Sequence, residues 1–304
     1  MDLSWLEDFL AIVDCGGFSR AAEKRNISQP AFSRRVRALE DWVGAALFDR
    51  STHNVVLTAA GERFRPVAEE TLRRLYLGRE EAMEASRASA GTLRFAATNA
   101  LSLTFFPAWL RGVEQRAALS EGVRLVADTM AACERIMLQG QAQFLLCHHH
   151  PAAQTLLDAH QFRSTHLGDD MLVPVCAPDP ARPGQPRYPL PGEAARPLPH
   201  LAYSAESGMG RIVEAVRGVD GPPAFLHASF TSHVATVLVA MAREGRGVAW
   251  SPLSLVADDF AAGRLVRAGD AAWDIPIEIR LFRARARQSA AAERFWALLD
   301  PVDG

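Results

Sequence analysis

The residues with the clearest chemical potential lie in the segment SQPAFSRRVR, which begins at Ser28. Glutamine and arginine side chains can bond base edges in two places at once, and serine or arginine can bond phosphates. At about 100° per residue, one arc of a helix would carry these types together. We predict that this arc contacts the DNA major groove and includes Ser28, Gln29, Pro30, Ser33, Arg34 and Arg37.

Two predicted helices position this arc. The first covers residues 19–25 and ends at the polar Asn26, after which Ile27 turns inward. Ser28 is the expected N-cap of the second helix, and Pro30 falls in its first turn, where a missing N–H costs nothing. An apolar stripe on the opposite side is formed by Phe32, Val36, Leu39 and Val43. Two helices joined by a tight turn predict a helix-turn-helix.

The flanking segments complete a DNA-binding domain. A helix over residues 3–14 closes the core, and LFDRSTHNVVLT predicts a small β wing. Arg50 and His53 lie on this wing, where they can reach the backbone or the minor groove. Thr58 can cap a long helix over residues 59–88, whose apolar stripe requires a partner helix. That stripe comprises Phe64, Val67, Ala68, Thr71, Leu72 and Leu75.

From residue 92 onward, short apolar segments alternate with helical ones. TLRFAATNA, VRLVADTM and AQFLLCHHH are predicted strands, and LSLTFFPAWLRGVEQR and ACERIMLQGQ are predicted helices between them. This alternation indicates a parallel sheet with crossover helices. The chain is expected to cross into a second unit near HLGDDMLVPVCAPD, with a proline-rich loop over residues 178–199. It should return near WDIPIEIRLFRA and close with the amphipathic helix AAAERFWALLD.

Composition excludes several classes. The chain has 304 residues, enough for two or three compact units. Its net charge of −2 neither supports nor excludes DNA binding. The N-terminus does not resemble a secretion signal, and no apolar run is long enough to span a bilayer, so we expect a cytoplasmic protein with no membrane partner. The sequence has no G-x-G-x-x-G, nucleophile elbow or clustered carboxylate pair, so we expect no enzyme and no cofactor. The four cysteines are expected to be free thiols.

FSRAAEKRNISQPAFSRRVRALEDWVGAALFDRSTHNVVLTAAGERF resembles the N-terminal domain of LysR-type transcriptional regulators. The later segments GRGVAWSP and ERFWALL resemble the effector domain of the same family. The resemblance implies an α+β winged helix-turn-helix with a long linker helix, followed by a two-lobed α/β effector domain like that of periplasmic binding proteins. It also implies binding to double-stranded promoter DNA, a homodimer through the linker helix, and a homotetramer.

The predicted domains follow from these elements. Residues 1–58 form the DNA-binding domain, 59–91 the linker helix and hinge, and 92–304 the effector domain. Lobe one comprises residues 92–166 and 271–304, and lobe two comprises residues 167–270.

In two-lobed α/β domains, ligands bind between the lobes where strands end and helices begin. By that rule the predicted effector site contains Thr98, Asn99, Ser102, Ser204, Ser207, Met209, Thr231, Ser232 and Trp250. Helix capping explains Ser102, Ser207 and Ser232 equally well.

Met209 lies in a glycine-flanked turn, SGMGR, where we expect its sulfur to be reachable and open to oxidation. An adaptable loop methionine is the alternative interpretation. The segments SQPAFSRRVRALE, ATNALSLTFFP, MGRIVEAV and GVAWSP most resemble the hypochlorite-responsive branch of the family, which implies methionine chemistry in this cleft.

The run Cys147-His148-His149-His150 contains residues that bind metals. Neighbouring residues on a strand face opposite sides, so at most two of the four share one side. With no second ligand cluster in the sequence, we expect no metal site.

The sequence therefore predicts a LysR-type regulator whose signal is hypochlorite or a related oxidant. Two alternatives stay open. The same regulator could respond to a small metabolite such as a carboxylate, or the chain could be a cytoplasmic solute-binding module with an added helical domain.

Overall fold

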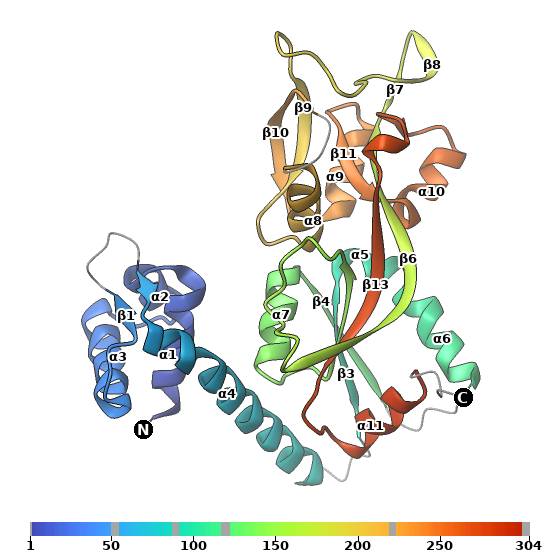
Figure 1. The fold of residues 1–304 in the computed structure, drawn as a ribbon. Helices are drawn as coiled ribbons and strands as arrows, with labels where there is room; N and C mark the ends of the chain where they lie inside the picture. Colours follow the sequence, from blue (N-terminus) through green and yellow to red (C-terminus); the bar gives the residue numbers. More distant parts are fainter. Residues whose placement is uncertain (1, 50–54, 87–90, 117–121, 219–222, 300–304) are drawn as a thin grey trace. The chain divides into compact units, whose positions relative to one another are not determined.

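The computed structural model describes residues 2–49, 55–86, 91–116, 122–218 and 223–299 (Figure 1). The chain divides into two compact units. One comprises residues 1–87 with 138–141, and the other comprises residues 88–137 with 142–304. Within this division, the predicted domain boundaries at residues 58 and 91 remain a proposal.

The first unit is a helical domain with a small β hairpin. Its elements are α1 (Leu3–Cys15), α2 (Phe18–Lys24), α3 (Gln29–Val43), β1 (Phe48–Asp49), β2 (Val56–Leu57) and α4 (Ala59–Ser86). The first three helices enclose a core in which Phe9, Phe32 and Leu39 are fully buried. Strands β1 and β2 pair antiparallel, which confirms the predicted wing.

The turn between α2 and α3 depends on local backbone geometry. Asn26 adopts a left-handed conformation with φ of 54°, a region that asparagine tolerates better than most residues. Ile27 then packs against the core, as predicted. Ser28 stands at the N-cap position with extended backbone, as predicted, although its side chain makes no capping hydrogen bond. Its hydroxyl is exposed instead.

Helix α4 begins where the sequence predicts. The backbone N–H of Gly61 donates to Thr58 Oγ1 over 3.1 Å, so Thr58 caps the helix. The predicted single stripe divides into two. Ala68 and Leu72 are buried in the core of their own unit, with Phe64 packed against it. Val67 and Leu75, by contrast, are 57% and 51% exposed, and Thr71 lies exposed between them.

The second unit contains the remaining elements. They are β3 (Leu93–Thr98), α5 (Asn99–Thr104), α6 (Phe106–Arg116), β4 (Val123–Asp128), α7 (Met130–Leu138), β5 (Phe144–His149), β6 (Phe162–Cys176), β7 (Pro178–Asp179), β8 (Arg182–Pro186), β9 (Leu198–Tyr203), α8 (Gly208–Arg217), β10 (Leu226–Ser232), α9 (Ala235–Arg243), β11 (Ala249–Pro252), α10 (Leu253–Ala261), β12 (Val266–Arg267), a short 3₁₀ helix (Ala271–Trp273), β13 (Ile275–Ala284) and α11 (Ala290–Ala297).

The main sheet is mixed rather than parallel. Its order is β11-β6-β13-β5-β3-β4, and β12 also pairs with β6. Strand β3 pairs parallel with β4 and β5, as the strand–helix alternation predicts. Strands β6 and β13 pair antiparallel because they carry the chain between the lobes in opposite directions, and β13 also pairs antiparallel with β5. Strands β11 and β12 pair antiparallel with the last residues of β6.

Two long strands connect the lobes. β13 pairs along its whole length with the first part of β6, from Ala284 opposite Phe162 to Ile275 opposite Leu172. In Figure 1 they run side by side from lobe one, with β3, β4 and β5, to lobe two, with β9, β10 and β11. Their register shifts between Ile279 and Arg280, near the middle of the pair. The two predicted crossings are therefore one antiparallel ribbon.

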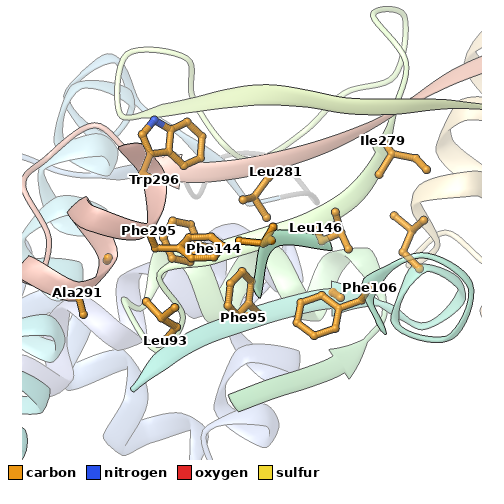
Figure 2. Packing of buried hydrophobic residues seen from close by; sticks show 14 residues of the cluster. Leu93, Phe95, Phe106, Phe144, Leu146, Ile279, Leu281, Ala291, Phe295 and Trp296 are labelled. Carbon is orange, nitrogen blue, oxygen red and sulfur yellow. The ribbon is translucent and has the colours of Figure 1, made fainter. Parts of the chain in front are cut away.

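The core of lobe one is aromatic, as Figure 2 shows. The rings of Phe95 and Phe144 stack with centroids 5.1 Å apart, and Phe295 packs edge-on against Phe95 at 5.4 Å. Because Phe295 and Trp296 come from α11, this helix closes the lobe, as its amphipathic pattern predicts.

Two local predictions are wrong. The segment predicted as one helix over residues 101–116 forms α5 and α6, with the break at Phe105. The proline-rich segment predicted as a loop contains the hairpin of β7 and β8, because its prolines lie in a short pair at the margin of the fold, where few ladder bonds are needed. Across the described ranges, no helix is long and apolar enough to cross a membrane.

Candidate functional site

Helix α3 separates an apolar face from a polar one. Phe32, Val36 and Leu39 are fully buried. On the opposite side, every predicted DNA contact of this helix is at least partly accessible: Ser28, Gln29, Pro30, Arg34 and Arg37 are exposed, and Ser33 is half-buried. The helix therefore presents a polar and cationic surface of the kind that reads base edges.

Arg35, between the two exposed arginines, has a different environment. Its Nε lies 2.8 Å from Asp8 Oδ2, and Arg25 Nε lies 3.0 Å from the other oxygen. Asp8 is completely buried, and burial raises its pKa even though both arginines oppose that shift. This buried carboxylate joins α1, the end of α2 and α3, and so fixes the orientation of the exposed arc. Sequence reasoning missed it; the signal is an acidic residue beside the apolar face of α1.

The wing residues Arg50 and His53 lie outside the described residues. The strands on either side are β1 and β2, and Glu40 of α3 holds the start of the first strand. Its Oε1 accepts hydrogen bonds from the N–H groups of Leu47, at 2.9 Å, and Phe48, at 3.3 Å. The base of the wing is thus tied to α3, and the DNA contacts of Arg50 and His53 remain predictions.

A cavity lies between the two lobes of the second unit. Lobe one contributes Thr98, Asn99, Ala100, Asp128, Thr129, Met130 and His148, and lobe two contributes Ser207, Gly208, Met209, His233 and Ala235. The cavity volume is about 30 Å³, which is room for an ion or one or two water molecules. Of the nine predicted effector residues, four line it: Thr98, Asn99, Ser207 and Met209.

Polar groups without partners face this cavity. His148 is 6% exposed, and neither of its ring nitrogens has a hydrogen-bond partner among the described residues. Its Nε2 lies 3.5 Å from Asp170 Oδ2. The buried Thr98 Oγ1 likewise has no partner within the described part of the chain. Buried polar groups require partners, so this arrangement favours a small polar guest.

Met209 is not in an exposed turn. It occupies the first turn of α8 and is 6% exposed, because Ser207 caps this helix and Met209 faces the core together with Ile212 at i+3. The expectation of a freely reachable sulfur is therefore wrong. The Tyr203 hydroxyl lies 3.2 Å from Met209 Sδ and 2.9 Å from the Trp250 carbonyl oxygen. Met209 is nevertheless one of the residues that line the inter-lobe cavity.

The other predicted effector residues lie elsewhere. Ser204 and Trp250 line a separate cavity of about 620 Å³ within lobe two. The Ser102 hydroxyl donates to the Asn99 carbonyl oxygen over 2.8 Å, and Ser232 Oγ accepts from the N–H of Val234 over 3.1 Å. Thr231 is exposed on β10. Ser102, Thr231 and Ser232 line neither cavity. Helix capping does not explain Ser102, which lies inside α5, or Ser232, which precedes the N-cap residue of α9; it explains Ser207, whose side chain caps α8.

Sequence reasoning also missed several lining residues of the inter-lobe cavity, among them Asp128, Met130 and His148. Asp128 ends β4, Met130 begins α7, and His148 is the penultimate residue of β5. The carboxyl ends of β3, β4 and β5 meet at one edge because these strands are parallel. The strand-end rule that selected Thr98 would have selected these residues as well.

Two family models match the chain. The bacterial regulatory helix-turn-helix protein, lysR family, matches residues 3–62, and the LysR substrate binding domain matches residues 86–302. The chain belongs to the LysR family. It is therefore a DNA-binding transcriptional regulator with a C-terminal effector-binding domain, and the interpretation as a solute-binding module is wrong. Both models describe regulator domains, so the chain is not an enzyme.

Individual LysR relatives agree along the whole length. The HTH-type transcriptional regulator YjiE of Escherichia coli is 32% identical over 100% of this chain and 95% of that protein. HypT of Salmonella typhimurium, described as hypochlorite-specific, is 31% identical, with a TM-score of 0.56 over 98% of this chain and 97% of that one. A separate structure of its regulatory domain holds a bromide ion, at 26% identity and a TM-score of 0.54 over 68% of this chain and 92% of that one.

Another LysR structure contains nucleic acid. Vibrio fischeri DarR in complex with DNA is 29% identical, with a TM-score of 0.54 over 100% of this chain and 99% of that one. Both the helix-turn-helix and the two-lobed domain of this chain therefore have counterparts in full-length family members.

Three of the four cysteines are buried, and the histidines of the run lie against different carboxylates. Cys133, Cys147 and Cys176 are buried, and burial raises the pKa of Cys133 to about 12, so this thiol stays protonated near neutral pH. His148 faces Asp170, whereas His149 Nδ1 lies 3.5 Å from Glu278 Oε2. Over the described ranges, no three His, Cys, Asp or Glu side chains are grouped as metal ligands.

Proposed function

We propose that this LysR-type regulator senses hypochlorite, or a related small oxidant, in the inter-lobe cavity. The observation that carries the proposal is an ion-sized cavity lined by the sulfur-bearing Met209 and by buried polar groups of both lobes. Ligand sites for organic metabolites are typically about 300–1,000 Å³. A carboxylate metabolite needs more room than about 30 Å³, so the oxidant is favoured over the metabolite. The likeness to the hypochlorite-specific HypT supports the same choice.

The chemistry is an oxygen transfer to Met209. Hypochlorous acid gives its oxygen to the thioether sulfur, the O–Cl bond breaks, and chloride and a proton leave; sulfur is oxidised and chlorine is reduced. The sulfoxide oxygen is a stronger hydrogen-bond acceptor than the thioether. The Tyr203 hydroxyl, with one proton to donate, lies between Met209 Sδ and the Trp250 carbonyl oxygen. We expect it to turn from Trp250 to the sulfoxide.

The output reaches DNA through the arc of α3. We propose that Ser28, Gln29, Pro30, Ser33, Arg34 and Arg37 contact the operator, with Arg50 and His53 on the wing. We further propose a homodimer through α4, with the exposed Val67, Thr71 and Leu75 at its seam, and a tetramer of two such dimers. A signal that favours one arrangement of lobes would change how the assembly bends its operator.

The test is oxidation followed by mass spectrometry. The full-length protein would be treated with one to a few equivalents of hypochlorite, and in parallel with the same amount of hydrogen peroxide. We expect hypochlorite to convert Met209 to sulfoxide before the other methionines of the chain. The Tyr203→Phe variant should be oxidised at the same site, since the cavity remains. Oxidation of exposed methionines while Met209 stays intact would overturn the proposal.

A further inference from the structure

The cavity inside lobe two has the size of a metabolite site. Its volume is about 620 Å³, within the range of sites that bury small organic ligands. One face of α8 lines it through Gly210, Val213, Glu214 and Arg217, which follow helical spacing. His200, Ala202 and Ser204 line it from β9 and the turn after it. Ser204 and Ser207 belong to the same turn, so this turn separates the cavity from the inter-lobe one.

Most of the wall is apolar. Val213, Leu226 and Trp250 contribute to it, and small residues leave the space open. The ring of His200 packs edge-on against Trp250 with centroids 5.6 Å apart. Burial lowers the pKa of His200 to about 4, so this ring is neutral near pH 7. A ring-sized or branched apolar body fits these surfaces.

The charged lining residues have opposite signs. Glu214 and Arg217 lie three residues apart on α8, where side chains are neighbours on one helix face. The Arg217 guanidinium lies 4.0 Å from the Trp273 ring centroid and 5.6 Å from that of Trp250. Burial lowers the pKa of Arg217, but arginine remains protonated at neutral pH. With five N–H donors, it can bind a ligand carboxylate in addition to its present contacts.

One residue that lines the cavity carries a buried hydroxyl. Ser204 Oγ is inaccessible to solvent and has no hydrogen-bond partner among the described residues. A buried hydroxyl without a partner is unfavourable, and rotation of the Ser204 side chain toward the cavity would bring it to a polar group of a ligand. The sequence predicts Ser204 and Trp250 as effector contacts in the inter-lobe cavity, whereas the structure places both in the lining of the lobe-two cavity.

We propose that lobe two holds a second ligand site, specific for a small zwitterion with an apolar body, that is, an apolar amino acid. Arg217 binds its carboxylate, Glu214 binds its ammonium group, and the body lies against Val213, Leu226 and Trp250. A ligand with only one of the two charges gains an ion pair with only one of these two side chains. The pair therefore sets specificity for zwitterions.

Tyr203 connects the two cavities. It lines the lobe-two cavity, and its hydroxyl touches both Met209 Sδ and the Trp250 carbonyl oxygen. Trp250 is itself part of the cavity wall. Occupancy of the second site is thus coupled to the state of Met209. This coupling rests on the proposed function, whereas the site itself does not.

The site is tested with three probes that share one ring but differ in charge. L-Phenylalanine is the zwitterion, 3-phenylpropanoate the anion and 2-phenylethylamine the cation; their binding to untreated full-length protein would be followed by ligand-observed NMR. We expect phenylalanine to bind with a Kd of about 1 mM or tighter, and each singly charged probe about ten-fold more weakly. Absence of phenylalanine binding, or equal affinity for all three probes, would overturn the proposal.

Matched variants locate the binding. Arg217→Gln should weaken the binding of phenylalanine and 3-phenylpropanoate but leave that of 2-phenylethylamine unchanged. Glu214→Gln should weaken the binding of phenylalanine and 2-phenylethylamine but leave that of 3-phenylpropanoate unchanged. Thr231→Val, on the exposed face of β10 outside both cavities, should change nothing. Circular dichroism would establish that each variant is folded. Phenylalanine binding that survives both charge variants would place it elsewhere.

The coupling is tested separately. Protein would be oxidised with hypochlorite, freed of oxidant, and titrated with phenylalanine, as wild type and as Tyr203→Phe. We expect oxidation to change the affinity about five-fold or more in the wild type and to have little effect in Tyr203→Phe. An unchanged affinity in protein whose Met209 is shown by mass spectrometry to be oxidised would refute the coupling. Failure to oxidise Met209 would instead refute the proposed function and leave the site standing.

Discussion

At the scale of single residues, neighbouring arginines of α3 have different tasks. Arg34 is exposed on the polar arc, whereas Arg35 pairs with the buried Asp8. We predict that Arg34→Ala weakens binding to promoter DNA by about 1–3 kcal/mol without changing the free energy of unfolding. Arg35→Ala should instead destabilise the fold by about 1.5–3 kcal/mol, because Asp8 loses a charged partner. Fluorescence anisotropy and urea unfolding measure the two effects. Equal DNA affinity for Arg34→Ala and the wild type would contradict this assignment.

Glu293 gives a prediction with a pH dependence. It accepts a hydrogen bond from the buried Arg283 over 3.0 Å, and this guanidinium holds the pKa of Glu293 below its ordinary value. A depressed folded-state pKa contributes stability that is present above the unfolded-state value and is lost as pH falls through the folded-state value. Glu293→Gln should therefore cost about 1–3 kcal/mol at pH 7, by loss of a bond to a buried charge.

The measurement is urea unfolding of Glu293→Gln and wild type from pH 7 downward. The difference in unfolding free energy should be constant above about pH 5 and should shrink below the ordinary glutamate pKa of 4.5. A difference that grows as the pH falls would have the wrong sign.

Single-residue chemistry was predictable from sequence where it depends on local spacing. Helical periodicity is enough to place Arg34 and Arg37 opposite Phe32 and Val36. It could not show that Met209 is buried, because the residues that cover it come from β9, β11 and the other lobe. Nor could it separate Ser204 from Ser207, which lie three residues apart yet line different cavities.

At the scale of elements, the start of α4 is held by a close backbone approach. A Cβ on Gly61 would lie 2.2 Å from the Leu47 carbonyl oxygen and 2.8 Å from Leu57 Cδ2. We predict that Gly61→Ala destabilises the protein by about 1–3 kcal/mol through overpacking, although alanine favours helices by about 1 kcal/mol over glycine.

Gly78 provides the matched control in the same helix. A Cβ there meets nothing within 4 Å. Gly78→Ala should therefore raise the thermal unfolding midpoint, whereas Gly61→Ala should lower it. If both variants stabilise the protein, the helix tolerates a side chain at residue 61 and the proposed contact between α4 and the wing is not rigid.

Hydrophobic periodicity predicts where most helices and strands lie, but it does not predict which elements pack against one another. The apolar residues of α4 were predicted as one stripe, because spacings of three and four residues are equally consistent with one broad face or with two adjacent faces. Only packing shows that Ala68 and Leu72 face their own core while Val67 and Leu75 do not. Likewise, apolar strands in β6 and β13 indicated crossings between lobes, but their antiparallel pairing depends on contacts more than 100 residues apart.

At the scale of the whole molecule, the exposed face of α4 predicts the assembly. Val67 and Leu75 are unusually exposed for apolar side chains on one helix face. We predict that the double substitution Val67→Glu, Leu75→Glu converts the proposed dimer to a folded monomer and strongly reduces operator affinity, because one DNA-reading domain then binds alone. Sedimentation velocity measures the change in mass. The control Glu62→Gln, on another face of α4, should remain dimeric; a dimeric double variant would exclude this seam.

The most direct test of the account measures operator affinity with and without the oxidant. Fluorescence anisotropy on promoter DNA would compare untreated and hypochlorite-treated protein, each as wild type and as Met209→Leu. We predict that treatment changes the Kd of the wild type about five-fold or more and leaves that of Met209→Leu unchanged, because leucine keeps the packing but has no sulfur to oxidise. An equal change in both proteins, or no change in the wild type, would contradict the claim that Met209 in the inter-lobe cavity receives the signal.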